Sequence, residues 1–122
     1  MSERVVLVGY GPVGARLIDG LLPAVRDGRI DLTVIGAESH DVYNRVLLAE
    51  YAVGRTDRAG LDMDDRRVAE EAGVRFHLAT AVVGVDRHRR VVRLHDGIRL
   101  DYDRLVLATG ARANVPTLAG ME

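Results

Sequence analysis

The pattern of apolar and polar residues in the first third of the chain predicts a strand, a helix and a second strand. The run 5–8 is continuously apolar, which is typical of a central parallel strand buried on both faces. Over 12–22 the apolar residues recur at helical intervals, and Pro12 is acceptable in the first turn of a helix. The β-branched run 31–35 then completes one β-α-β unit.

The rest of the chain predicts one more helix and several short strands. The run 62–73 begins with an aspartate cluster and ends in glycine, which favours a helix with Asp64 or Asp65 as its N-cap and Gly73 at its C-terminus. Strands are expected at 74–78, 81–86, 91–95, 98–102 and 105–108. Asp96-Gly97 is a strong hairpin signal, so the middle strands should form a small antiparallel meander. The expected fold class is α/β, with a parallel sheet and this β-meander.

The turn between the first strand and the first helix carries the clearest chemical signal. Glycines 9, 11 and 14 have the G-x-G-x-x-G spacing, in the strand–turn–helix context that this motif requires. Gly9 would permit the tight turn, Gly11 the approach of a pyrophosphate, and Gly14 close packing of helix and strand. A helix N-terminus favours an anion without any lysine. The predicted cofactor-binding turn comprises Gly9, Gly11, Pro12, Val13 and Gly14; the alternative is a glycine turn that merely fits a tight packing site.

An acidic residue after the second strand is the expected partner of a cofactor ribose. In the usual dinucleotide fingerprint this carboxylate would stand at Ala37, so Glu38 comes one position late. Two interpretations stay open. Either Glu38 reaches the ribose along a slightly different backbone path, or it is an exposed loop residue and backbone groups hold the ribose.

Composition excludes several classes of function. The 122 residues fit a single domain that is 48% apolar, and the net charge of −1 argues against a broad electrostatic grip on nucleic acid or anionic membranes. All 17 basic residues are arginine, which excludes a Schiff-base lysine, and the absence of cysteine excludes thiol and iron–sulfur chemistry. The first glycine turn comes too early for a signal peptide or membrane span, so we expect a cytoplasmic protein.

Three groups of polar residues are interpreted as non-functional. The run 87–90 has no interleaved aromatic residues, so it is predicted to be a solvated turn and not a nucleic-acid patch. The aspartates at 62, 64 and 65 lack the further ligands of a calcium loop, and the four histidines show no ligand spacing. We therefore predict no metal site and no catalytic residue in this chain.

Two further motifs resemble those of flavoprotein reductases with two dinucleotide-binding domains. The stretch 43–54 is similar to a Tyr-(Asp/Asn)-Arg-Val-x-Leu-(Ser)-Glu-Tyr-x-x-Gly block in the large subunit of NAD(P)H-dependent nitrite reductase. Ala108-Thr109-Gly110, followed by Pro116 and Gly120, resembles the second signature of these flavoproteins. Ferredoxin and rubredoxin reductases are also similar, but they usually carry lysine at the position of Glu50.

The resemblance implies FAD as the cofactor and adds residues to the predicted site. Arg45 would pair with the pyrophosphate, and its alternative is a surface arginine at a helix start. Glu50 and Tyr51 would lie near the flavin ring. The backbone of 80–82 would flank the adenine, and the A-T-G signature would approach the cofactor at a strand's carboxyl end. The residues added to the site are Arg45, Ala81, Val82, Ala108, Thr109 and Gly110.

The resemblance also implies that 1–122 is one domain, the N-terminal part of an FAD/NAD(P)-binding domain, truncated before the NAD(P)H-binding domain and a returning strand. The implied function is the FAD-binding segment of an NAD(P)H-dependent oxidoreductase, most similar to nitrite reductase and inactive as this chain alone. The alternatives are a ferredoxin or rubredoxin reductase, and a nucleotide-sensing regulatory module, which would lack the meander. Without the returning strand, strand 105–108 would be an uncovered edge, so we expect self-association there.

Overall fold

The computed structural model describes residues 2–39, 52–55 and 66–111. Its helices and strands, in chain order, are β1 (Glu3–Val8), α1 (Pro12–Arg26), β2 (Ile30–Ile35), α3 (Arg66–Ala72), β3 (Arg75–His77), β4 (Val82–Asp86), β5 (Val91–Leu94), β6 (Arg99–Asp101) and β7 (Arg104–Leu107). The predicted N-cap at Asp64 or Asp65, the aspartates at 62–65 and Arg45 lie outside the described residues. Within the described ranges no helix is long and apolar enough to span a membrane.

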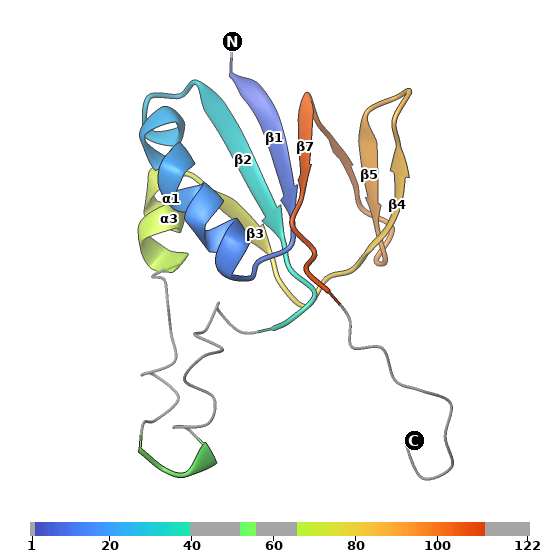
Figure 1. Cartoon of the computed structure of the whole chain (residues 1–122). Helices are drawn as coiled ribbons and strands as arrows, with labels where there is room; N and C mark the ends of the chain where they lie inside the picture. The colour runs from blue at the N-terminus through green and yellow to red at the C-terminus, as the bar shows by residue number, and fades with distance from the viewer. Residues whose placement is uncertain (1, 40–51, 56–65, 112–122) are drawn as a thin grey trace, which may run out of the picture.

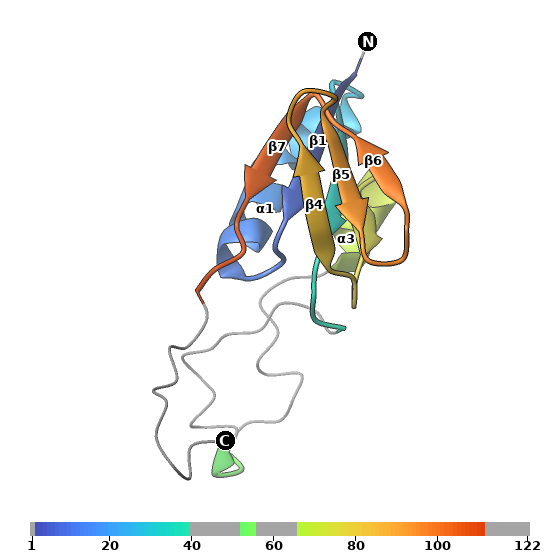
Figure 2. The same cartoon turned by 90° about the vertical axis from the view of Figure 1, so that its right-hand side faces the viewer.

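A four-stranded parallel sheet forms the centre of the molecule. Its strand order is β3-β2-β1-β7, and β4, β5 and β6 form a separate antiparallel sheet. Figures 1 and 2 show α1 and α3 on one face of the parallel sheet and the β4–β6 meander on the other. The meander is inserted between β3 and β7, as the resemblance implied.

The continuous apolar run of β1 is explained by these two layers. Val5 and Leu7 belong to the core cluster under α1 and α3, whereas Val6 and Val8 pack in the cluster that includes Val92 of β5. Successive side chains of a strand point to opposite faces, so a strand covered on both sides needs apolar residues at every position. The prediction of a central parallel strand is confirmed.

Helix α1 continues beyond its predicted end. The expected range 12–22 stopped before Pro23, but the helix runs through this proline to Arg26. Proline in a helix interior removes a hydrogen bond and crowds the preceding turn. Here the last turn buries Val25, which is 7% exposed in the core, and Gly28 N–H donates to Val25 O (3.0 Å). Burial of the last turn therefore outweighs the local effect of Pro23.

The predicted turns are confirmed, with strand ends shifted by about one residue. Gly73 has φ +113°, and Val74 N–H donates to Ala69 O (3.0 Å), which closes α3. The Asp96-Gly97 hairpin is closed by Leu94 N–H donating to Ile98 O (2.9 Å). The run 87–90 forms the β4–β5 turn with all its residues exposed, as expected.

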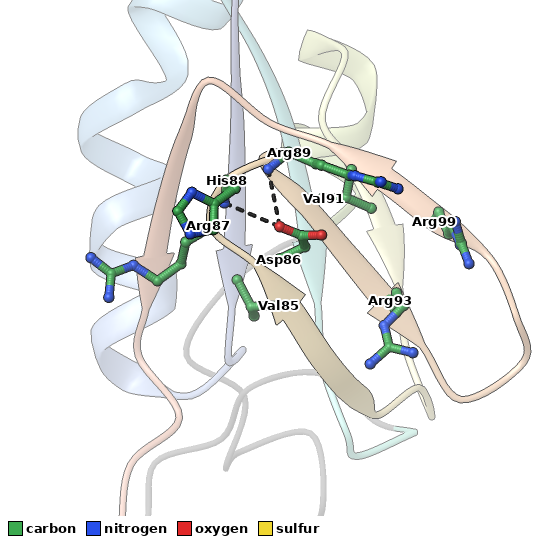
Figure 3. A pocket seen from close by; sticks show the side chains of 8 residues that line it. All are labelled: Val85, Asp86, Arg87, His88, Arg89, Val91, Arg93 and Arg99. Carbon is green, nitrogen blue, oxygen red and sulfur yellow. Dashed lines mark hydrogen bonds between the residues drawn. The ribbon is translucent and has the colours of Figure 1, made fainter.

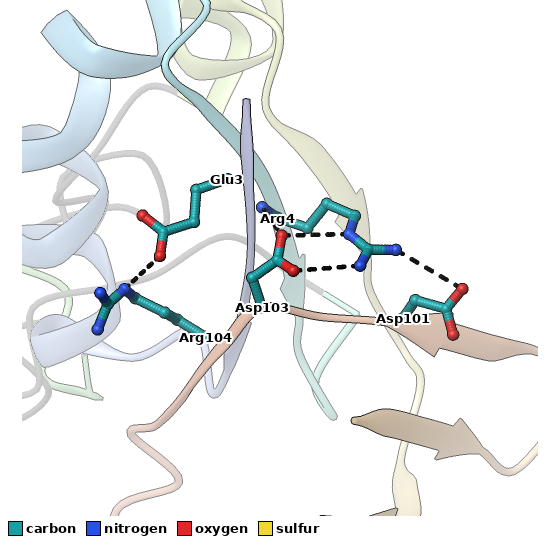
Figure 4. Close-up of polar contacts among 5 residues, drawn as sticks. All are labelled: Glu3, Arg4, Asp101, Asp103 and Arg104. Atoms are coloured by element: carbon teal, nitrogen blue, oxygen red, sulfur yellow. Dashed lines mark hydrogen bonds and ion pairs between the residues drawn. The ribbon is translucent and has the colours of Figure 1, made fainter. Parts of the chain in front are cut away.

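Ion pairs tie the two ends of the described chain together beside the sheet (Figure 4). Arg4 Nε and Nη2 donate to the two carboxylate oxygens of Asp103 (3.2 and 3.1 Å), and Arg4 Nη1 lies 3.7 Å from Asp101 Oδ2. The hydrogen bonds from Arg4 hold the pKa of Asp103 below its usual value. Arg104 donates to Glu3 on the other side of β1. These contacts fix the starts of β1 and β7 beside each other.

Candidate cofactor-binding cleft

A cleft of about 600 Å³ lies at the carboxyl ends of the parallel strands. Ligands of open α/β sheets bind at this edge, and a volume of this size is ordinary for a cofactor site. The cleft is lined by Val8, Gly9, Tyr10, Gly11, Pro12, Val13, Ile35, Gly36, Ala37, Glu38, Thr80, Ala81, Val82, Leu107, Ala108, Thr109, Gly110 and Ala111. Every predicted site residue lines it except Gly14, which is buried beneath the turn, and Arg45, Glu50 and Tyr51, which lie outside the described residues.

The three glycines of the turn have different physical roles. A Cβ on Gly9 would come within 3.0 Å of Ala108 O, and Gly9 also has φ +113°. A Cβ on Gly14 would come within 3.0 Å of Gly9 O. Around Gly11, by contrast, nothing lies within 4 Å of the added Cβ, and its φ of −104° suits any residue. Tight packing therefore explains Gly9 and Gly14 but leaves Gly11 without a packing role.

The first turn of α1 offers donors to an anion in the cleft. Gly11 is the N-cap, no side chain caps this helix end, and the first turn has no acidic residue. The first N–H groups of a helix have no partner within the helix, and Pro12 has no N–H, so Val13 and Gly14 supply the leading donors. The Val13 side chain is 70% exposed and leaves this end of the helix open. Together with the space above Gly11, this turn fits the pyrophosphate of a dinucleotide.

The acidic residue after β2 lies at the cleft. Both Ala37 and Glu38 line it. The backbone of this loop is fixed by Thr80 N–H donating to Gly36 O (2.9 Å) and Ala79 N–H donating to Glu38 O (3.0 Å). The structure therefore brings Glu38 to the same edge as the glycine turn, as the first interpretation of this residue requires.

His95 of the meander forms hydrogen bonds with Ala81, which lines the cleft. The sequence alone did not predict this role for His95. Ala81 N–H donates to His95 Nδ1 (3.0 Å), and His95 N–H donates back to Ala81 O (2.9 Å). Thr80, only 9% exposed, donates its hydroxyl to Leu78 O (2.8 Å). His95 does not line the cleft, so it orients the lining residue Ala81 without touching a bound ligand. No sequence spacing marks it, because the contact depends on how β4 and β5 pair.

The Ala108-Thr109-Gly110 signature forms the opposite wall. Ala108 N–H donates to Val8 O (2.8 Å), which continues the pairing of β7 with β1 into the cleft. Ala108 O packs against Gly9, so the two glycine-containing motifs are in contact. Gly110 has φ +74° and nothing within 4 Å of an added Cβ. In this left-handed conformation the chain turns away while its backbone stays open to the cleft.

Residues 3–122 match the family model of the pyridine nucleotide-disulphide oxidoreductases, and the chain belongs to this family. It is 36% identical over 111 residues to the nitrite reductase [NAD(P)H] of Bacillus subtilis, covering 90% of this chain and 14% of that protein. It is 35% identical over 126 residues to a nitric oxide reductase FlRd-NAD(+) reductase of Salmonella gallinarum, covering all of this chain and 32% of that protein. The chain thus spans less than a third of these relatives.

Solved structures of a reductase and an oxidase share the fold. The putidaredoxin reductase–putidaredoxin complex matches with a TM-score of 0.83 at 28% identity, covering 97% of this chain and 28% of that one. The water-forming NADH oxidase from Lactobacillus brevis matches with a TM-score of 0.88 at 23% identity, covering 99% and 28%. The predicted family and the Rossmann-like fold class are confirmed. The family binds FAD and uses NAD(P)H, which agrees with the predicted cofactor.

Proposed function

We propose that this chain binds the adenosine and pyrophosphate of FAD within an NAD(P)H-dependent flavoprotein reductase. The open space at Gly11 carries the proposal, because neither packing nor backbone conformation requires glycine there. A ligand that approaches the backbone does require it. Family membership and the cleft at the strand ends support the same ligand.

Each wall of the cleft has a role in this proposal. The N–H groups of Val13 and Gly14 bind the pyrophosphate, and Glu38 or the backbone beside it accepts hydrogen bonds from the ribose. The backbone of 81–82 flanks the adenine, at the position held by His95. When bound, FAD would supply the redox chemistry of the NAD(P)H-dependent reductase. The chain's own residues bind and orient the cofactor, and none is assigned an acid–base role.

For the whole reductase we propose the nitrite reductase class. The motif at 43–54 supports it, and so does the 36% identity to the Bacillus subtilis enzyme. A reductase that delivers electrons to rubredoxin- or ferredoxin-type proteins is the second candidate, favoured by the 35% identity to the Salmonella protein. A nucleotide-sensing regulatory module has less support, because the β4–β6 meander that it would lack is present. Reading the coding sequence downstream of Glu122 separates these classes.

Calorimetric titration of the chain with FAD, ADP and FMN tests the cofactor proposal. We expect FAD and ADP to bind and to compete with each other, because both carry the adenosine and pyrophosphate. FMN lacks the adenosine half, so it should bind at least about tenfold more weakly. Equal binding of FMN, or no binding of either adenine nucleotide, would contradict the proposal.

A further inference from the structure

A second hollow, of about 830 Å³, lies on the meander and shares no residue with the cofactor cleft. Its lining is Val85, Asp86, Arg87, His88, Arg89, Val91, Arg93 and Arg99. Figure 3 shows Arg89, Arg93 and Arg99 on one side of Asp86, with Arg87 on the other. We call Arg89, Arg93 and Arg99 the arginine patch. All three are exposed.

The arrangement of the arginine patch is unfavourable for the isolated fold. Arg93 of β5 stands directly opposite Arg99 of β6 in the antiparallel pairing, and like charges directly opposite each other destabilise a sheet. Among the described residues, no ion pair involves any arginine of the patch. The Arg93 guanidinium lies over Gly84, whose lack of a side chain leaves room for it.

Among the described residues, no carboxylate of the meander forms an ion pair with the arginine patch, although the backbone N–H of Arg89 and, to a lesser extent, its charge lower the pKa of Asp86. Asp86 Oδ1 accepts hydrogen bonds from the backbone N–H groups of His88 (3.1 Å) and Arg89 (3.0 Å). Asp96 Oδ1 accepts from Ile98 N–H (3.0 Å), and Asp101 pairs with Arg4. All three aspartates of the meander therefore serve turns or the sheet. In the part of the chain that the structure describes, Arg93 and Arg99 have no carboxylate partner, so they are available to an external anion.

The surroundings of the patch favour a protein partner. Guanidinium groups bind carboxylates in paired hydrogen bonds, and arginine is enriched at protein interfaces. Val83 and Val85, 58% and 39% exposed, add apolar surface to the same sheet. The hollow is lined by no Phe, Tyr or Trp on which a base could stack, and its one ring is the imidazole of His88. We propose that the arginine patch docks an acidic segment of a partner protein through paired carboxylates.

The test is fluorescence anisotropy of a labelled hexaglutamate peptide titrated with the full 122-residue chain at low salt. Hexaglutamine is the neutral control peptide. We expect the glutamate peptide to bind and its affinity to fall as salt rises, because salt screens exposed charges. The double variant Arg93→Ala/Arg99→Ala should weaken binding at least about tenfold. The control variant Arg16→Ala/Arg26→Ala removes the same charge from exposed positions of α1, on the other face of the sheet, and should bind as the unmodified chain does.

A single variant separates binding from folding. Arg99→Glu places a carboxylate opposite Arg93, so the melting temperature should rise while affinity for the glutamate peptide falls. A lower melting temperature with unchanged affinity would assign these arginines a structural role and overturn the proposal. Equal binding of both peptides, or equal loss in the two double variants, would also overturn it. Tighter binding of duplex DNA or phosphatidylserine vesicles, abolished by Arg93→Ala/Arg99→Ala, would replace the protein partner by that class.

Discussion

Replacing Gly11 by serine should make the chain more stable and a weaker binder of adenine nucleotides. A Cβ added at Gly11 meets nothing within 4 Å, and the extended backbone at this N-cap accepts a side chain without strain. A serine hydroxyl can accept a hydrogen bond from the first turn of α1, and loss of glycine reduces the entropy of the unfolded chain. Together these effects should raise the free energy of unfolding by about 0.5–1 kcal/mol. In a domain of this size that shifts the melting temperature by roughly 2–4 °C.

The same hydroxyl would occupy the space through which a pyrophosphate approaches. Loss of a hydrogen bond to a charged group is worth about 1.5–3 kcal/mol, so the affinity for ADP should fall by roughly ten- to a hundredfold. Urea unfolding and calorimetric titration with ADP measure the two effects on the same protein. Affinity equal to that of the unmodified chain, or loss of both stability and affinity, would refute the assignment of Gly11.

Two neighbouring glycines provide matched controls. Gly20 lies exposed on α1 with nothing within 4 Å of an added Cβ, so Gly20→Ala should stabilise the helix by about 0.5–1 kcal/mol and leave ADP affinity unchanged. Gly9→Ala places a methyl group against Ala108 O at φ +113°, and this strain should destabilise the fold by about 1–3 kcal/mol or more. Of the three substitutions, only that of Gly11 should raise the free energy of unfolding and at the same time lower the affinity for ADP.

Four further outcomes are expected. His95→Ala removes the acceptor of Ala81 N–H, which should weaken ADP binding and lower the free energy of unfolding by about 0.5–1.5 kcal/mol. Unchanged hydrogen exchange at the Ala81 amide would contradict the role of His95. Hydrogen bonds from Arg4 lower the pKa of Asp103, so the stability that this carboxylate contributes is present above the unfolded pKa of about 3.9 and is lost as pH falls through the lowered pKa. Urea unfolding of Asp103→Asn should therefore show a smaller fall in the free energy of unfolding on acidification than the unmodified chain shows. Strand β7 pairs only with β1 in the described sheet, so its other edge is open to pairing with a second chain. Light scattering over a dilution series should detect dimers, and Leu107→Lys, which replaces an exposed apolar residue of β7 by a charged one, should weaken them; a persistent monomer would refute this. The chain alone should not oxidise NADH in the presence of FAD, because hydride transfer needs a bound donor, and measurable turnover would show a complete active site.

The parts of the fold that depend on local signals could be predicted from the sequence. The apolar run of β1, the glycine turn and the Asp96-Gly97 hairpin each fix a backbone conformation within a few residues, and all three are confirmed. The end of α1 could not be predicted, because burial of Val25 outweighs the helix-breaking tendency of Pro23. Tertiary burial of this kind leaves no mark in the local sequence.

The candidate site shows the same division. The cleft residues could be located because the G-x-G-x-x-G turn and the A-T-G signature have fixed spacings, and the strands bring both to one edge. Two other features could not be located from the sequence, because both depend on strand register. They are the contact of His95 with Ala81 and the alignment of Arg93 with Arg99. Register in the meander shifts between Val82 and Gly84, which no periodicity in the sequence indicates.

An NMR titration of the ¹⁵N-labelled chain with ADP tests most directly whether the glycine turn is the cofactor site. The account predicts that the amide signals of Val13, Gly14 and Gly110 shift together and saturate, while those of Arg93 and Arg99 stay in place. Shifts confined to the arginine patch would mean that the phosphates bind there and that the cleft has another role. The absence of shifts at Val13 and Gly14 at saturating ADP would contradict the central claim.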